Sequence, residues 1–364
     1  MALEADVIVV GTGAGGSPVA LTLARAGAKV LMFERGPRYS RKDFVHDEVR
    51  VARRNFFVPS VATDPHVVAV KGRPPERTHD GWVSSCVGGG TVHMSGFFYR
   101  FSPEDFRVRE LLGPLDGATH ADWPIDYQTM QPYYAQVMRE IGVSGAEDEG
   151  PWAPRRDVPY PVPPVDTHPA AALIDRAASK LGLHAFATPR AIISRPFGGR
   201  QQCTYCHLCG GFGCEVGAKS STLDTLIPAA EATGNCQVLP ETMVTRIILG
   251  TDDRASGVAY RDATGIEQQA RARVVVIACS AVESIRLMLL STGPQDPQGL
   301  GNREGQLGQH LMFSTLSKAF GSFHSLRTRK ERRCSRTTRL FWDVLSSTTT
   351  YLAATRRLCA RRGL

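Results

Sequence analysis

A short run of β-branched residues near the N-terminus leads directly into a glycine-rich turn. The segment Asp6–Glu34 reads DVIVVGTGAGGSPVALTLARAGAKVLMFE. The run Val7–Val10 predicts a buried strand, the glycines predict a tight turn, and the apolar residues after them predict a helix. A second apolar run ends in Glu34, 23 positions after Gly11. This order of strand, turn, helix and strand predicts the first βαβ unit of a dinucleotide-binding fold.

Four glycines and one acid of this unit are the expected cofactor contacts. Gly11 allows the tight turn, Gly13 lets the backbone approach a pyrophosphate, and Gly16 lets the helix pack on the strand. The helix that begins near Gly15 directs N–H groups and a positive dipole at the phosphates. Glu34 is expected to accept hydrogen bonds from the ribose hydroxyls. The alternative is a glycine-rich turn in some other α/β protein.

The length of 364 residues and the hydrophobic content of 42% are sufficient for a large core in two lobes. No stretch approaches the roughly 20 apolar residues of a membrane span. No secretory signal precedes the first predicted strand. From the sequence we therefore expect a cytoplasmic protein, or one at the periplasmic side of the inner membrane if a partner subunit carries it there.

The net charge of +8 is concentrated in the last forty residues. Residues 325–364 contain eleven Lys and Arg and two acidic residues, a net charge of +9, so the rest of the chain carries −1. That body shows no basic face with interleaved aromatics, which argues against a nucleic-acid partner. Segment 325–364 also lacks sheet and helix patterns, which favours a shifted reading frame and a disordered tail. A basic tail that binds a membrane or a partner is the alternative.

The second half of the chain alternates short apolar runs with turns. The last run is fully apolar, which is typical of a parallel strand buried on both faces of a sheet. The strands before it predict a β-meander that returns the chain to the N-terminal sheet. Helices are predicted within 123–142, 170–183, 223–233 and 284–291. The predicted strands are Cys236–Leu239, Val244–Leu249, Ser256–Arg261, Gln268–Ala272 and Val274–Cys279.

Three further stretches share a family pattern with the N-terminal unit. Cys86–Gly96 reads CVGGGTVHMSG, Ala270–Leu290 reads ARARVVVIACSAVESIRLMLL, and Gly308–Met312 reads GQHLM. Together they resemble the glucose–methanol–choline (GMC) flavoprotein oxidoreductases, and among these the large subunits of bacterial sugar and sugar-acid dehydrogenases, the gluconate dehydrogenase group. Ser280 replaces a glycine of the family pattern. The resemblance extends from Ala5 to about Phe323.

The resemblance implies an α/β fold, with a Rossmann-like FAD-binding domain and a partial α+β substrate domain. The FAD-binding domain, a parallel sheet plus a β-meander, is expected to be discontinuous. The implied divisions are 1–36, 82–101 and 200–310 for the FAD-binding domain, 37–81 for a lid or connection, and 102–199 with 311–324 for the partial substrate domain.

The resemblance also implies FAD as the cofactor, bound along both glycine-rich segments. Several relatives attach the flavin 8α-methyl group to a histidine at the place that matches His93, so both a covalent and a noncovalent flavin are open. Besides the five residues above, the implied contacts are Gly89, Gly90, Thr91, His93, Met94 and Val244.

In the family, an alcohol loses its proton to a histidine base and its hydride to flavin N5. The implied substrate is a sugar, sugar acid or polyol, and the implied partners are a small subunit and an electron-transfer cytochrome subunit. No residue here matches the family's C-terminal base, so we expect this chain to lack it and not to turn over. A base within the chain would be sought among His79, His93, His120 and His310. The alternatives are an NAD-dependent oxidoreductase and a non-catalytic flavin-binding fragment.

Four cysteines stand close together in the spacing C-x2-C-x2-C-x4-C. Tight thiolate runs of this kind hold iron–sulfur clusters, whereas zinc usually pairs two CxxC units across a longer loop. Some bacterial relatives use three cysteines in the matching segment for a [3Fe–4S] centre, and others have a similar segment without one. The alternative is a disulfide or free thiols, and His207 is a weaker ligand candidate. The four cysteines are Cys203, Cys206, Cys209 and Cys214.

Overall fold

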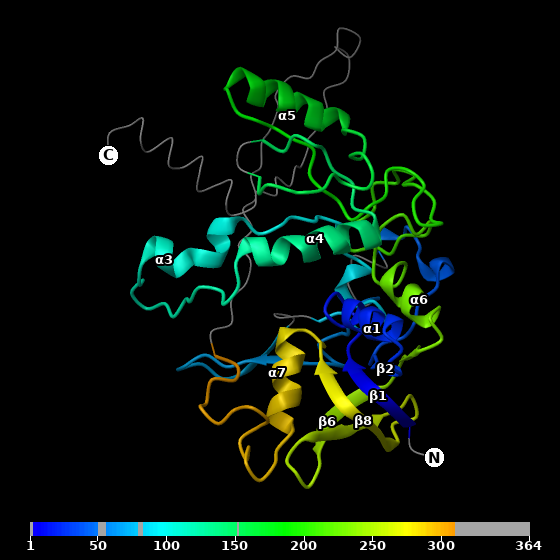
Figure 1. Cartoon of the computed structure of the whole chain (residues 1–364), viewed down its shortest axis with the longest axis vertical. Coiled ribbons are helices and arrows are strands. Elements are labelled where there is room, and N and C mark those ends of the chain that lie inside the picture. Colours follow the sequence, from blue (N-terminus) through cyan, green and yellow to red (C-terminus); the bar gives the residue numbers. More distant parts are fainter. Residues whose placement is uncertain (1–2, 50–55, 79–82, 151–152, 310–364) are drawn as a thin grey trace. The chain divides into compact units, whose positions relative to one another are not determined.

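The structure is a computed structural model that describes residues 3–49, 56–78, 83–150 and 153–309 (Figure 1). The predicted tail 325–364, the substrate-domain segment 311–324 and the candidate bases His79 and His310 lie outside these residues. Contacts divide the described chain into two compact units. The larger falls within 3–98, 128–149 and 156–309, and the smaller within 99–127 and 150–155.

The N-terminal βαβ unit forms as predicted. Strand β1 (Leu3–Val10) pairs in parallel with β2 (Val30–Phe33), and helix α1 (Gly16–Arg25) connects them. Along β1, Val7 and Val9 pack with α1, whereas the alternate residues join the cluster on the other face of the sheet. A parallel strand covered on both faces needs apolar side chains at every position, which explains the unbroken β-branched run.

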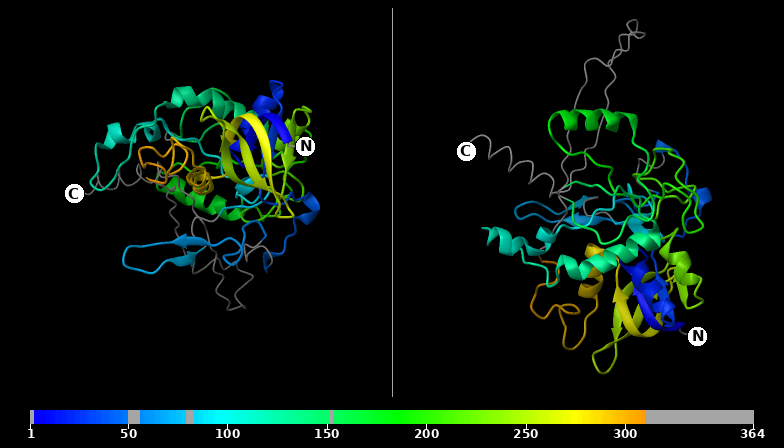
Figure 2. Two further views of the ribbon diagram at one scale, coloured as in Figure 1. Left: turned by 90° about the horizontal axis from the view of Figure 1, so that it is seen from below. Right: turned by 45° about the horizontal axis from the view of Figure 1, so that its top comes forward.

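One six-stranded sheet has the order β5-β2-β1-β8-β7-β6, and Figure 2 shows it from two further directions. Neighbours among β5, β2, β1 and β8 are parallel, whereas β8, β7 and β6 form an antiparallel meander. The predicted fold class, a parallel sheet with a β-meander, is therefore confirmed. The remaining strands of the sheet are β5 (Cys236–Leu239), β6 (Met243–Leu249), β7 (Ala255–Arg261) and β8 (Glu267–Ile277).

Two details of the predicted meander were wrong. The strands predicted at Gln268–Ala272 and Val274–Cys279 are one continuous strand, β8, because its first part pairs with β7 while its later part continues along β1. Its apolar end is also less buried than predicted, since Val274 is 49% exposed. The pairing with β7 ends at Arg271, so no described strand pairs with the outer edge beyond it.

The other predicted helices form with small shifts at their ends. Helix α7 packs beside β6, and α6 packs on α1 through Ile227 and Ala230. None of the described helices is long and apolar enough to cross a membrane. Outside the sheet, the elements of the larger unit are η1 (Arg41–Asp43), β3 (His66–Val68), β4 (Glu76–Thr78), η2 (Gly89–Thr91), α4 (Tyr127–Ile141, except its first residue), α5 (Pro169–Lys180), α6 (Leu226–Glu231) and α7 (Ala281–Leu290).

The smaller unit contains η3 (Pro103–Arg107) and α3 (Val108–Leu112). Phe106 is only 3% exposed, and its ring centroid lies 6.1 Å from that of Phe101 and 6.3 Å from that of Trp123. Since Phe101 and Trp123 are themselves about half exposed, this cluster is small and open to solvent on one side.

Candidate cofactor site

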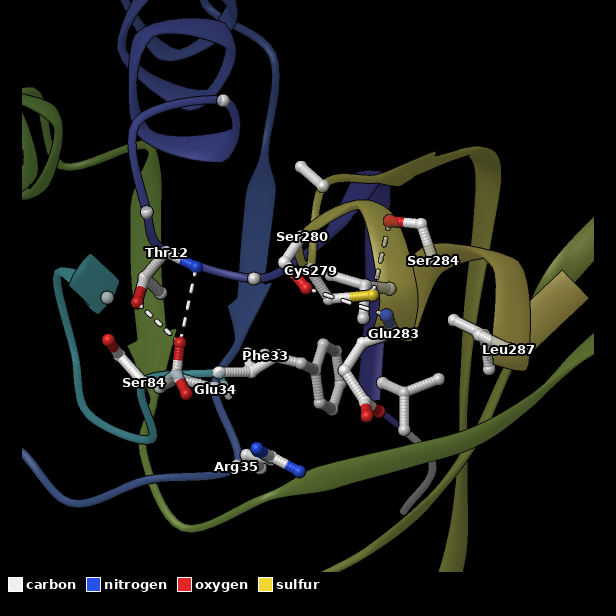
Figure 3. A pocket seen from close by; sticks show the side chains of 18 of the residues that line it. Thr12, Phe33, Glu34, Arg35, Ser84, Cys279, Ser280, Glu283, Ser284 and Leu287 are labelled. Atoms are coloured by element: carbon white, nitrogen blue, oxygen red, sulfur yellow. Dashed lines mark hydrogen bonds between the residues drawn. The ribbon is translucent and has the colours of Figure 1, made fainter. Parts of the chain in front are cut away.

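A cavity of about 560 Å³ lies at the carboxyl ends of β1, β2 and β8, entirely within the larger unit (Figure 3). Dinucleotides bind at this edge of parallel sheets, where helix N-termini and turns gather. Seven of the predicted cofactor residues line the cavity: Gly11, Gly13, Gly15, Glu34, Gly89, Gly90 and Val244. Gly16, Thr91, His93 and Met94 do not line it.

The glycines of the N-terminal turn are required for two different reasons. Gly11 has a φ of 99°, and a Cβ there would lie 2.5 Å from the carbonyl oxygen of Ala278. A Cβ on Gly16 would overlap the carbonyl oxygen of Gly11. Gly13, by contrast, has no protein atom within 4 Å of a Cβ position. Gly11 and Gly16 therefore serve the packing of the chain, whereas Gly13 keeps space open in the cavity.

The second glycine-rich segment meets the first at the cavity wall. A Cβ on Gly89 would lie 3.1 Å from Cα of Gly13. The backbone N–H of Gly88 donates to Oγ1 of Thr12 at 2.9 Å, and Gly88 itself has a φ of 95°. Segments about 75 residues apart thus form one continuous wall, as a single extended dinucleotide requires.

Three threonine hydroxyls hold this wall together. Thr222 Oγ1 donates to the carbonyl oxygens of Thr12 (3.1 Å) and Gly88 (3.2 Å). Thr91 Oγ1 donates to the Gly88 carbonyl at 2.7 Å and accepts the backbone N–H of Thr222 at 3.0 Å. Thr91 therefore supports the wall from behind. Sequence reasoning missed Thr12 and Thr222, because nothing in their local sequence indicates these long-range contacts.

Glu34 is only 7% exposed and is already well bound by the protein. Its Oε2 accepts the Thr12 hydroxyl at 2.7 Å and the Thr12 backbone N–H at 3.3 Å, and its Oε1 accepts the Gly36 N–H at 3.1 Å. Burial raises the pKa of Glu34, and the hydrogen bonds from Thr12 and Gly36 oppose that rise. An ionised carboxylate has about four acceptor positions, so roughly one remains for a ribose hydroxyl.

His93 does not line the cavity but contacts Ser84, which does. Its Nε2 is 2.5 Å from Oγ of Ser84, which lines the cavity, and its ring stacks on Phe57 with centroids 5.1 Å apart. Burial, together with the positive charge of Lys219, lowers the pKa of His93 to about 4. The imidazole is therefore neutral at physiological pH.

The four cysteines line a second, small cavity of about 20 Å³. Within the described residues they are free thiols, and no group of three or more Cys, His, Asp or Glu is arranged to hold a metal ion. Burial raises the pKa of the Cys203 and Cys209 thiols. Cys206 and His207 are exposed. The four cysteines thus line one small cavity, but the described residues do not show a metal-binding geometry.

Lys219 attaches this cysteine segment to the residues after the second glycine segment. It is 2% exposed, and its Nζ donates to the carbonyl oxygens of Met94 (3.0 Å), Cys209 (2.9 Å) and Phe212 (2.6 Å). The N–H of Gly211 also donates to the carbonyl of His93 at 2.8 Å. Burial lowers the pKa of Lys219 to about 8. Sequence reasoning gave no role to this lysine.

Comparisons with known proteins agree with this geometry. The family model of GMC oxidoreductases matches residues 82–313, and that of an FAD-binding domain matches residues 6–42. Paromamine 6'-oxidase from Streptomyces fradiae is 33% identical over 84% of this chain and 53% of its own length. The fructose dehydrogenase large subunit of Gluconobacter japonicus is 28% identical over 85% of this chain and 58% of its own length.

A solved FAD-dependent oxidoreductase from Chaetomium thermophilum has the same fold, with a TM-score of 0.52, 18% identity, and coverage of 80% of this chain and 48% of that one. The chain thus spans about half the length of the relatives it matches. The FAD-binding-domain match supports FAD, rather than NAD, as the dinucleotide. With a family match over residues 82–313 and a 33% identical relative, the chain belongs to the GMC oxidoreductase family.

Proposed function

We propose that this chain forms the FAD-binding part of an oxidoreductase that oxidises CH–OH groups of sugar-like or other alcohol donors. The main support is that Gly13 and Gly89 approach each other at the wall of one cavity, which the buried Glu34 also lines. Two relatives named for oxidising paromamine and fructose support the substrate class.

The residues of the cavity fit the parts of FAD. The start of α1 at Gly15 and Gly16 would present N–H groups to the pyrophosphate, and Gly13 would leave the room that the phosphates need. Glu34 would offer an acceptor position to a ribose hydroxyl, and Gly89 and Gly90, which line the same cavity, would lie along the flavin end of the cofactor. Bound FAD would supply the hydride acceptor, while the chain supplies orientation and exclusion of water.

The test is the visible spectrum of the purified 364-residue protein, before and after anaerobic addition of gluconate, fructose or a polyol. Because no described residue matches the family's histidine base, the flavin spectrum should appear and should not bleach, whereas bleaching with one of these donors would show that the chain completes a catalytic site. A stable flavin spectrum without bleaching identifies a flavin-binding fragment. Absence of flavin after reconstitution with FAD would refute the proposal.

We also propose that the cysteine segment binds an iron–sulfur cluster. Support comes from the four cysteines around one small cavity and from Lys219, which holds them beside Met94. Binding requires the loop to rearrange, because the described cavity is small. Iron and acid-labile sulfide are measured on anaerobically purified protein, with Cys206→Ser compared with the control Cys236→Ser. An iron-free protein that carries a full complement of flavin would exclude the cluster.

A covalent bond between His93 and the flavin is a further proposal. Its support is that Ser84, which lines the cavity, contacts the His93 ring directly. Acid precipitation should leave yellow colour in the wild-type pellet and release free flavin from His93→Gln. Free flavin in the wild-type supernatant would rule out the bond.

Electron transfer to a cytochrome subunit, with a small subunit in the complex, is proposed from the likeness to a protein named as a large subunit. Co-expression with such subunits from the same genome, followed by co-purification, tests this. In the absence of any stable complex, the flavoprotein would have to pass electrons directly to a soluble acceptor.

A further inference from the structure

Ser84 lines the cofactor cavity (Figure 3), and its Oγ lies 2.5 Å from Nε2 of His93. A Cβ on Gly90, another residue that lines the cavity, would lie 3.5 Å from the same Oγ. The Ser84 hydroxyl is therefore close both to the glycine wall of the cavity and to the imidazole.

Backbone contacts fix the position of this hydroxyl. The N–H of Ser85 donates to the carbonyl oxygen of Phe57 at 2.7 Å, and the Phe57 ring is the one that stacks on His93. A Cβ on Gly36 would overlap the carbonyl group of Ser85, so the chain on either side of this point is closely packed. Ser84 is therefore held beside the imidazole by the same residue on which the imidazole stacks.

The ring of His93 is neutral and has a partner for each of its nitrogens. Burial and the positive charge of Lys219 lower the pKa of His93, and a hydrogen bond with the backbone of His93 itself opposes this fall. Nδ1 is the ring nitrogen nearest to a histidine's own backbone, so Nδ1 donates in that bond and carries the proton of the neutral ring. Nε2 is then the acceptor, and the Ser84 hydroxyl is its donor.

We propose that Ser84 is a positioning residue for His93, whose hydroxyl donates to Nε2 and holds the ring in the tautomer with its proton on Nδ1. The hydrogen bond that each ring nitrogen makes decides which of them is protonated. The unprotonated Nε2 is then directed at a residue of the cavity wall, and an unprotonated nitrogen is what the proposed bond between His93 and the flavin needs. In this respect the inference rests on the proposed function.

The opposite tautomer fits these contacts less well. With the proton on Nε2, that N–H would donate to the Ser84 oxygen, and the Nδ1 lone pair would face the carbonyl oxygen of His93. Two acceptors that face each other form no hydrogen bond, and an unmade bond in a shielded place costs free energy. With the Ser84 hydroxyl as donor, both ring nitrogens are satisfied.

The experiment measures the tautomer of His93 in the flavin-free full-length protein at neutral pH, by heteronuclear NMR of the histidine ring nitrogens. The signals of His93 are those that are missing from His93→Gln. The variants are Ser84→Ala, which removes the donor, and Ser84→Thr, which keeps a hydroxyl. Ser85→Ala is the matched control, because Ser85 is the next residue and does not line the cavity. A second readout is the share of flavin that stays with acid-precipitated protein a fixed time after FAD is added.

The wild type, Ser84→Thr and Ser85→Ala should carry the proton on Nδ1. In Ser84→Ala the ratio of the Nδ1–H to the Nε2–H tautomer should fall by about twofold to tenfold, the loss of one neutral hydrogen bond, and flavin retention should slow by a similar factor. A proton on Nε2 in the wild type, or an unchanged ratio in Ser84→Ala, would overturn the role of Ser84. Flavin that acid releases from the wild type would refute the covalent bond, and a protein that binds no FAD would refute the proposed function. In both cases the tautomers of the flavin-free proteins would still decide the role of Ser84.

Discussion

Substitution of Gly13 by aspartate separates cofactor binding from folding. No protein atom lies within 4 Å of a Cβ at this position, so the new side chain meets only the space of the cavity. The folded apoprotein should therefore be as stable as the wild type. Gly13→Ala should even be more stable by about 0.4–1 kcal/mol, because alanine restricts the unfolded chain.

The effect on the cofactor follows from charge. An aspartate carboxylate about 4 Å from a phosphate would repel it by about 1 kcal/mol in water and about 4 kcal/mol in the more protected environment of a protein surface. These energies correspond to a weakening of FAD binding by about fivefold to a thousandfold, before steric exclusion is added. Gly16→Ala is the comparison variant that should affect folding instead of cofactor binding, because its Cβ would overlap the Gly11 carbonyl oxygen. Such overpacking costs about 1–3 kcal/mol or more of stability.

Two measurements are needed, the thermal unfolding of the apoproteins and the ratio of flavin to protein absorbance after reconstitution. Gly13→Asp should unfold at the wild-type temperature and remain colourless, whereas Gly16→Ala should unfold at a lower temperature. A yellow Gly13→Asp protein would show that the phosphates lie elsewhere. A destabilised Gly13→Asp apoprotein would contradict the open space that the structure gives to this position.

Three other perturbations have defined outcomes. Thr222→Val removes a hydroxyl that bonds the Thr12 and Gly88 carbonyls, and should cost about 1–3 kcal/mol in denaturant unfolding and weaken FAD binding. His93, with its pKa lowered to about 4 from 6.5, binds fewer protons folded than unfolded between these values, so stability is lost as pH falls through this window. Relative to His93→Gln, the wild type should lose up to about 3 kcal/mol between pH 6.5 and pH 4, and equal pH profiles would disprove the buried neutral ring. Lys219→Met leaves three carbonyls without their donor and should speed alkylation of the cysteines by iodoacetamide; unchanged alkylation would show that the lysine does not hold the loop.

The local sequence was sufficient to predict those features of the fold and the site that depend on neighbouring residues only. The Val7–Val10 run, the glycine turn and Glu34 specify a strand, a turn and an acid through steric and periodic rules that act over a few residues. The structure places Gly11, Gly13 and Glu34 at one cavity. The meander was predicted for the same reason, because alternation and turn residues mark each strand by itself.

Contacts between distant segments could not be predicted in this way. Thr222 bonds Thr12 across 210 positions, and Lys219 reaches Met94 across 125. A threonine or a lysine carries no local sign of such a role, since most of them lie at the surface.

The end of β8 is more apolar in sequence than its burial among the described residues would require. Four consecutive β-branched residues, Val274–Ile277, have the composition of a strand enclosed on both sides, yet Val274 is 49% exposed. On one edge they pair with β1 through Ile277, whereas the pairing with β7 on the other edge ends at Arg271. An unprotected edge of this kind is an aggregation hazard that folded proteins normally cover. Among the described residues, no strand pairs with this edge of β8 beyond Arg271, although the apolar sequence of Val274–Ile277 is typical of a covered strand.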